Sequence, residues 1–257
     1  MTRVASACDL FVTTDGYTAP KIPNSLVIRQ GVPDDVDHEY QWEIEPRWDV
    51  LFLGWPYRDR GYMVDALTHA FGPRFRHETS VRGKDLTALI RQCRLCVGPQ
   101  SPYFPGYWSN RLYVVTGHGG LFAAPPVDGM AQEGWRSGEN FLALPIDPEQ
   151  MAGKLQEYTR CDPGQLDTIR RRGYELANSK FTYDERVKQL LAAVAAEPDE
   201  PTELDAEPIA MIDRESGPRE KVEITAADVG DLNDLLGLTH QAGDAVSGES
   251  STVQEAS

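Results

Sequence analysis

Residues 94–124, RLCVGPQSPYFPGYWSNRLYVVTGHGGLFAA, decide the fold class. A short apolar run, Arg94 to Gly98, is followed by a long loop, a helical pattern from Arg111 to Thr116 and a second apolar run, Gly120 to Ala124. A strand, a helix and another strand in this order are typical of a βαβ unit with parallel strands. The stretch therefore predicts a parallel sheet with helices packed on its faces.

The same alternation continues on both sides of this unit. We expect further strands at Asp9 to Thr14, Leu26 to Arg29, Val50 to Gly54, Arg74 to His77 and Phe141 to Leu144. Helical patterns occupy Tyr62 to Phe71, Asp85 to Cys93, Pro148 to Thr159, Pro163 to Ser179 and Tyr183 to Ala195. Asp147 and Asp162 each precede a proline at a first helical position, which is a strong start signal. The sequence therefore predicts an α/β, Rossmann-like fold.

Composition divides the chain into three parts. Residues 31–48 are polar and without periodicity, so they read as a connector, and residues 1–30 look like the last piece of a preceding α/β domain or an edge that packs on the main one. We place the division at residue 40, with residues 1–40 as the remnant and hinge and residues 41–196 as the main domain. Residues 197–257 hold 16 acidic and 3 basic residues, no Phe, Trp or Tyr, and nearly all of the net charge of −15. Such a segment buries too little apolar surface to offset its ordering entropy, so we expect a disordered acidic tail. Within it, residues 225–238 show an amphipathic pattern that predicts either a helix docking on a partner or a solvated segment.

Charge and hydropathy exclude several classes of protein. Neither part of the chain has the basic excess needed to bind nucleic acid by charge. No apolar run reaches the roughly 18 to 20 residues that span a bilayer, and the N-terminus lacks the apolar core of a signal peptide. Four cysteines are too few and too scattered for a disulfide framework. We therefore expect a cytoplasmic protein.

Two clusters imitate metal sites. Cys93 and Cys96 form a CxxC pattern, but no second Cys or His pair lies at metal-binding spacing, which favours a structural role. Asp34, Asp35 and Asp37 imitate a DxD motif, yet they lie in the polar connector and favour a solvated linker. We expect no metal.

Three loops are candidates for a binding site, because ligands of open parallel sheets bind beyond the carboxyl ends of the strands. The first loop follows the strand at Val50 and contains Gly54, Tyr57 and Arg58. A glycine here permits close backbone approach, a helix start offers free N–H groups to a phosphate, and Arg58 adds positive charge. A purely steric role for the glycine is the alternative.

The second candidate loop, residues 100–111, holds Trp108, Ser109, Asn110 and Arg111. Ser109 or Asn110 is expected to cap the following helix, whose N-terminus favours an anion. Aromatic side chains of this loop either stack on a nucleobase or sugar, or fill the core beneath the loop.

The third candidate is the turn Gly117, His118, Gly119 and Gly120. Glycines cluster where backbone approaches another group closely or adopts positive φ. His118 is then an acid, a base or a hydrogen-bond donor to phosphate, with a surface turn residue as the alternative.

The order of these motifs resembles a known family. The carrying stretches are DVLFLGWPYRDR (49–60), LTALIRQCRLCVG (86–98), YWSNRLYVVTGHGGLFAAPPVDGM (107–130), EGWRSGENFLAL (133–144) and RRRGYELANSKFTYDERVKQLL (170–191). Over about residues 48–195 they resemble the C-terminal, donor-binding domain of GT-B glycosyltransferases, specifically the spore-maturation-protein-like group of glycosyltransferase family 1. Arg111 matches the arginine of the family's Asn-Arg motif and Tyr113 the aromatic two positions on; Gly117, Gly119 and Gly120 match its glycine turn, and Tyr183 and Arg186 its final helix.

This resemblance implies a glycosyltransferase that takes a UDP- or GDP-linked sugar as co-substrate and needs no cofactor. Positive side chains and helix N-termini take over the stabilisation of the leaving diphosphate, so metal is usually not required. The acceptor would be held by an N-terminal domain, of which the chain carries about 40 residues; a separate subunit is one source of the remainder.

Two departures from the family keep other functions open. Val114 and Gly106 stand where related enzymes carry glutamates for the nucleotide ribose and the donor sugar. A valine accepts no hydrogen bond from ribose hydroxyls. One alternative is therefore a catalytically inactive nucleotide-binding or assembly module. Another is a sugar-nucleotide epimerase, because such enzymes share the GT-B architecture.

Overall fold

The computed structural model of this chain describes residues 10–14, 16, 19–22, 24–39, 43–56, 60–100 and 103–195. All of them belong to one compact unit, Met1–Pro201. The acidic tail with residues 225–238 lies outside the described residues, as do Tyr57 and Arg58. Among the helices that the structure describes, none has the length and apolar character to cross a membrane.

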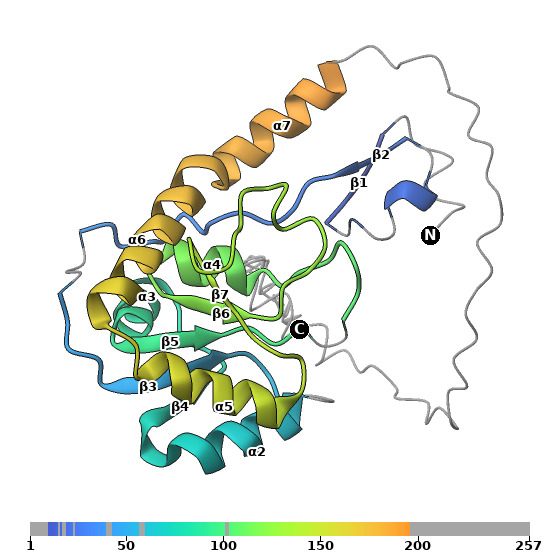
Figure 1. The fold of residues 1–257 in the computed structure, drawn as a ribbon. Helices are drawn as coiled ribbons and strands as arrows, with labels where there is room; N and C mark the ends of the chain where they lie inside the picture. The colour runs from blue at the N-terminus through green and yellow to red at the C-terminus, as the bar shows by residue number, and fades with distance from the viewer. Residues whose placement is uncertain are drawn as a thin grey trace, which may run out of the picture. The chain divides into compact units, whose positions relative to one another are not determined.

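Five strands form the central sheet, in the spatial order β4-β3-β5-β6-β7 (Figure 1). They are β3 (Trp48–Leu53), β4 (Phe75–Glu78), β5 (Cys93–Val97), β6 (Phe122–Ala124) and β7 (Leu142–Ala143). Every neighbouring pair is parallel; Val50 of β3, for example, pairs with Phe75 on one side and Leu95 on the other. This arrangement confirms the predicted α/β, Rossmann-like fold, and the strand ends differ from the predicted ones by at most two residues.

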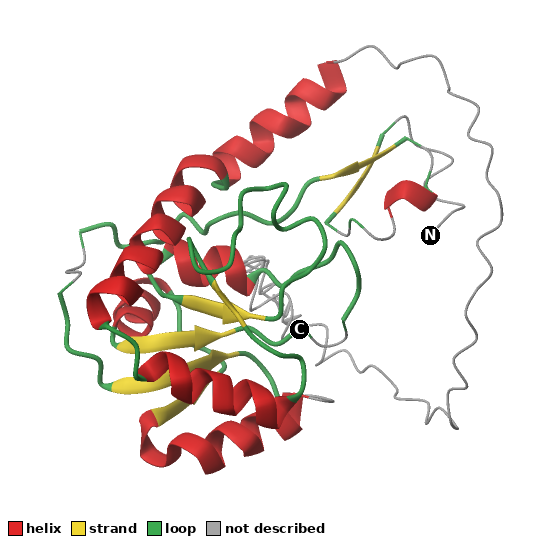
Figure 2. Cartoon of the chain, in the orientation of Figure 1, coloured by secondary structure: helices red, strands yellow, loops and turns green. Residues whose placement is uncertain are grey.

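Helices cover both faces of this sheet (Figure 2). α2 (Arg60–Phe71) and α5 (Pro148–Thr159) cover one face, where Met63, Leu67 and Leu155 share a buried cluster with Val50 and Phe52. α3 (Gly83–Arg91) and α4 (Arg111–Gly117) cover the other, in a cluster that includes Leu51, Leu89, Ile90, Leu112 and Phe122. Because both faces are buried, the strands are apolar runs rather than alternating patterns.

Two further helices close the main domain, α6 (Pro163–Lys180) and α7 (Tyr183–Ala195). The predicted helix starts are confirmed: Asp147 caps α5 by accepting from the N–H of Gln150, and Asp162 caps α6 by accepting from that of Gln165, both at 2.9 Å. Proline at the first helical position costs no hydrogen bond, because that N–H has no partner inside a helix.

A separate two-stranded parallel sheet precedes the main domain. It consists of β1 (Phe11–Thr13) and β2 (Ser25–Val27), joined through the short 3-10 helix η1 (Ala19–Lys21); a second such helix, η2 (Gly72–Arg74), leads into β4. Two strands rarely form a stable sheet alone. The stretch after β2 contacts the start of α7: Val32 bridges Thr182, the residue before α7, and Arg186 of α7 donates to the carbonyl oxygen of Gln30 at 3.4 Å. The division at residue 40 stays a prediction.

Candidate functional site

The strand order locates the crevice in which a sheet of this type binds ligands. The chain places β4 on one side of β3 and then β5 on the other, so the direction reverses between β3 and β5. In open parallel sheets the ligand crevice lies beyond the carboxyl ends of the strands at such a reversal. Gly54 follows β3 and Gly98 follows β5, so the first and second candidate loops both begin here.

Arg111, the first residue of α4, reaches from the second loop to the end of β3. Its Nε donates to the carbonyl oxygen of Leu53, and its Nη1 donates to Ser109 Oγ at 2.9 Å. Its guanidinium carbon lies 5.3 Å from the centre of the Phe52 ring. The residue is 8% exposed. A positive charge is thus fixed at the reversal point.

Gly54 allows this approach. It has a φ of +134°, and a Cβ built on it would lie 2.1 Å from Arg111 Nη2, so a side chain here would collide with the guanidinium. Its carbonyl oxygen lies 2.7 Å from Nε2 of His77, whose ring stacks on Phe52 with 5.2 Å between centroids. No sequence pattern indicates His77, because only the pairing of β3 with β4 brings it to Gly54.

Ser109 and Gln100 extend the site toward β5. Ser109 Oγ accepts from the backbone N–H of Arg111 at 3.3 Å, whereas Asn110, at the N-cap position, makes no capping hydrogen bond. Of the two capping candidates, Ser109 therefore accepts from the first N–H of α4, whereas Asn110 has helical backbone angles and does not cap the helix. Gln100 Oε1 accepts from the N–H of Ser109 at 3.2 Å, which ties the start of the loop to its end.

Trp108 and Tyr113 lie in the core rather than on an open surface. They are 4% and 1% exposed, and Trp108 Nε1 donates to the Tyr113 hydroxyl at 3.1 Å. Burial raises the pKa of Tyr113, with nearby Glu133 adding to the effect. These aromatics fill the core beneath the loop, while Tyr103 and Tyr107 remain more than a third exposed.

A partly buried ion pair beneath the same loop joins Arg29 and Glu133, and no local sequence pattern predicts it. The guanidinium of Arg29 lies 3.4 Å from the centre of the Trp108 ring, and its Nε donates to Glu133 Oε1 at 2.7 Å. Glu133 Oε2 in turn accepts from the Tyr113 hydroxyl at 3.2 Å. Arg29 and Glu133 are 104 residues apart, so no local pattern reveals their contact.

The third candidate, Gly117 to Gly120, lies at the opposite end of α4. The turn follows the C-terminus of α4 and precedes β6, which puts it at the edge where the strands begin. A Cβ on Gly117 would lie 2.4 Å from a Val32 methyl, one on Gly120 would lie 2.5 Å from an Ile90 methyl, and Gly119 has a φ of +84°. Packing and turn geometry account for these glycines, and the structure does not bring them together with Gly54 and Arg111.

His118 is fully buried within this turn. Its Nδ1 lies 2.7 Å from Thr87 Oγ1, and its Nε2 lies 3.9 Å from a carboxylate oxygen of Asp35. Burial lowers its pKa to about 4, with Asp35 opposing this effect and Arg91 supporting it. A neutral imidazole held by Thr87 packs α3 against α4.

The two metal-like clusters have other surroundings. Cys93 and Cys96 are buried thiols of β5 that form no disulfide; burial raises the pKa of Cys93 to about 12 and raises the pKa of Cys96 well above its ordinary value. Asp35 accepts from the N–H of Gly83 at 2.9 Å and so caps α3 from a distant segment. Within the described ranges, no three His, Cys, Asp or Glu side chains gather closely enough to hold a metal ion.

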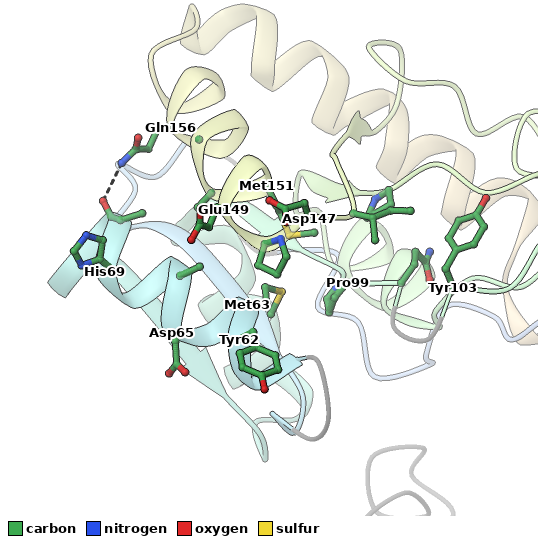
Figure 3. A pocket seen from close by; sticks show the side chains of 18 residues that line it. Tyr62, Met63, Asp65, His69, Pro99, Tyr103, Asp147, Glu149, Met151 and Gln156 are labelled. Atoms are coloured by element: carbon green, nitrogen blue, oxygen red, sulfur yellow. Dashed lines mark hydrogen bonds between the residues drawn. The ribbon is translucent and has the colours of Figure 1, made fainter. Parts of the chain in front are cut away.

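An open groove of about 1190 Å³ runs between α2 and α5 up to the carboxyl edge of the sheet (Figure 3). Figure 3 shows His69 and Gln156 toward one end and Pro99 and Tyr103 at the other. Gln100 lines it as well, so the groove adjoins the Ser109–Arg111 loop.

The parallel sheet with helices on both faces matches the fold of solved GT-B glycosyltransferases. HepE from Anabaena, solved with UDP and glucose, aligns with a TM-score of 0.57 at 14% identity, over 76% of this chain and 66% of that chain. Sucrose-phosphate synthase from Thermosynechococcus elongatus aligns with a TM-score of 0.55 at 16% identity, over 75% and 59%. TarM from S. aureus aligns with a TM-score of 0.53 at 9% identity, over 75% and 45%. This chain therefore spans about two thirds or less of the length of these structures.

The sequence model of the family described as glycosyl transferase-like matches residues 41–192. This chain belongs to that family, which confirms the resemblance at family level. The narrower spore-maturation-protein-like group stays a prediction. No curated protein matches the chain.

The two positions that lack the family's glutamates have structural roles here. Gly106 has a φ of +71°, and its carbonyl oxygen accepts from the N–H of Gly16 at 3.1 Å. Val114 is partly buried and packs against the cluster beneath α4. Neither residue supplies a carboxylate to the edge where Arg111 lies.

Proposed function

We propose that this chain binds the nucleotide-diphosphate sugar of a glycosyl transfer reaction at the carboxyl ends of β3 and β5. The observation that carries the proposal is Arg111, fixed over Gly54 at the reversal point of the sheet. A diphosphate beside Arg111 would meet a charge that is already in position, so little ordering is needed when the leaving group gains negative charge. The UDP and UDP-glucose bound to HepE support a nucleotide sugar as ligand.

The roles within the site follow from the contacts. Ser109 orients Arg111 from one side and Leu53 from the other, while Gly54 leaves room for the guanidinium. Tyr57 and Arg58 of the same loop are proposed to contribute to the donor site. The acceptor would be bound and activated by an acceptor domain, for which a separate subunit is one source.

Titration calorimetry with UDP-glucose, UDP-GlcNAc and GDP-mannose tests this proposal. We expect one of these donors to bind below millimolar Kd, and Arg111→Ala to weaken that binding about tenfold or more, as loss of a charge-assisted hydrogen bond does. Arg136→Ala, which removes an arginine with 61% side-chain exposure in another loop, is the matched control and should bind like the parent protein. Arg111→Lys keeps the positive charge and serves as a second variant in case Arg111→Ala fails to fold.

The alternative, an inactive nucleotide-binding or assembly module, is favoured by Val114 and Gly106. Under that alternative, Arg111→Ala leaves the biological role intact, whereas under the main proposal it abolishes turnover. Failure of every donor to bind the parent protein would remove the enzymatic proposal for this chain.

A further inference from the structure

A buried hydrogen-bond donor lies at the end of the groove that adjoins Arg111. Gln100 is 6% exposed, and its Oε1 accepts from the backbone N–H of Ser109. Because an N–H cannot pair with the NH₂ of a carboxamide, turning the amide over would lose this bond. Ser109 therefore fixes which end of the carboxamide is the donor.

The other end of the same amide, Nε2, is buried and has no hydrogen-bond partner among the described residues. Buried polar groups in native proteins are nearly always paired, so an exception calls for an explanation, of which a bound ligand is one. Gln100 lines the groove, which makes a ligand atom in the groove a natural partner.

The groove beside Gln100 suits a flat ring. Pro99, Tyr103 and Pro125 line the groove, and Tyr103 is 38% exposed. Figure 3 shows Pro99 and Tyr103 at the same end of it. Aromatic and proline faces offer planar apolar contacts, while the amide supplies one directed hydrogen bond. Ser109 links Gln100 to Arg111 through two successive hydrogen bonds, so a ring at Gln100 and a diphosphate at Arg111 are neighbouring groups, as in a nucleoside diphosphate.

We propose that Gln100 selects the base of the donor nucleotide, with its Nε2 donating to the keto oxygen at position 4 of uracil. This inference rests on the proposed function and names its nucleotide. Position 4 lies far from the ribose and so enters the groove ahead of the sugar. Cytosine carries an amino group at that position, so two hydrogen-bond donors, this amino group and Gln100 Nε2, would face each other.

Titration calorimetry with UDP and CDP on the full chain tests the assignment. The parent protein should bind UDP about tenfold or more tightly than CDP, because CDP leaves a buried donor unpaired. In Gln100→Glu, one carboxylate oxygen can still accept from Ser109 while the other becomes an acceptor, so the UDP-to-CDP affinity ratio should fall to one or below. The ratio is the readout, since an added charge weakens both nucleotides alike.

Gln156→Glu, which makes the same change in α5 on the groove's other side, is the control and should leave the ratio unchanged. Gln100→Leu provides a second variant, in which discrimination should also disappear. A parent ratio near one, or an unchanged ratio in both Gln100 variants, overturns the assignment while the donor site stands. No binding of UDP, CDP or any donor sugar to the parent overturns both.

Discussion

Gly54 combines a left-handed backbone with a direct contact to Arg111, and the two effects can be separated. Gly54→Ala should destabilise the fold by about 1 to 3 kcal/mol through backbone strain, and more through the collision with the guanidinium. Gly138→Ala is the control, because Gly138 has a φ of +78° and nothing within 4 Å of its Cβ position. Urea unfolding should show a larger loss for Gly54→Ala; equal losses would mean that Arg111 moves aside freely.

Because burial lowers the pKa of His118, we expect the stability of the fold to depend on pH. Its folded pKa of about 4 lies below the model-peptide value of 6.5, so the unfolded chain binds the extra proton between these values. Its contribution is therefore complete above pH 6.5 and is lost as the pH falls toward 4, with a total on the order of 3 kcal/mol. His118→Gln should flatten the unfolding free energy across this window, whereas exposed His69→Gln should not. An unchanged pH profile in His118→Gln would show that this imidazole protonates as readily in the folded protein.

Among the helices, the contribution of the capping carboxylates of α5 and α6 to stability can be tested directly. Asp147→Ala and Asp162→Ala each remove a carboxylate that accepts from a first-turn N–H, and each should cost about 1 kcal/mol. Asp→Asn at the same positions keeps an acceptor and should cost less. Thermal unfolding of the four variants measures this, and equal effects of Ala and Asn would point to charge rather than to the hydrogen bond.

The burial of β5 leads us to expect that its two thiols react more slowly than the thiol of Cys161. Cys93 and Cys96 are buried and their pKa values are raised, whereas Cys161 is partly exposed. Alkylation with iodoacetamide followed by peptide mass mapping should label Cys161 in the native protein and label Cys93 and Cys96 only in denaturant. Native labelling at Cys93 or Cys96 would contradict the packing of β5 in the sheet centre.

These elements show what the sequence could and could not predict. The bounds of α5 and α7 were predicted to the residue, because capping signals and apolar periodicity are local. β7 was predicted as four residues and has two. The apolar residues on either side of it are also buried, so an apolar run does not mark where the strand begins and ends. At the site, the adjacency of Gly54 and Arg111 depends on the spatial order of β3 and β5. The glycine turn looked equally suited to a ligand, and only the topology places it at the other edge.

At the scale of the whole molecule, the net charge of −15 belongs to the tail rather than to the domain that holds Arg111. An acidic tail cannot help bind an anionic donor, so its expected role is solubility or recruitment of a partner. Truncation after Ala195 should therefore leave donor affinity and the unfolding temperature of the domain unchanged. A loss of stability on truncation would indicate that residues 196–257 pack on the folded unit.

The central claim is that a nucleotide sugar binds where β3 and β5 end. The most direct measurement is a crystal structure of this chain with UDP or a UDP-sugar. We expect the diphosphate within hydrogen-bond distance of Arg111 and above Gly54, with the base toward Gln100. A nucleotide bound at the other edge of the sheet, near His118, or no bound nucleotide at saturating concentration, would contradict it.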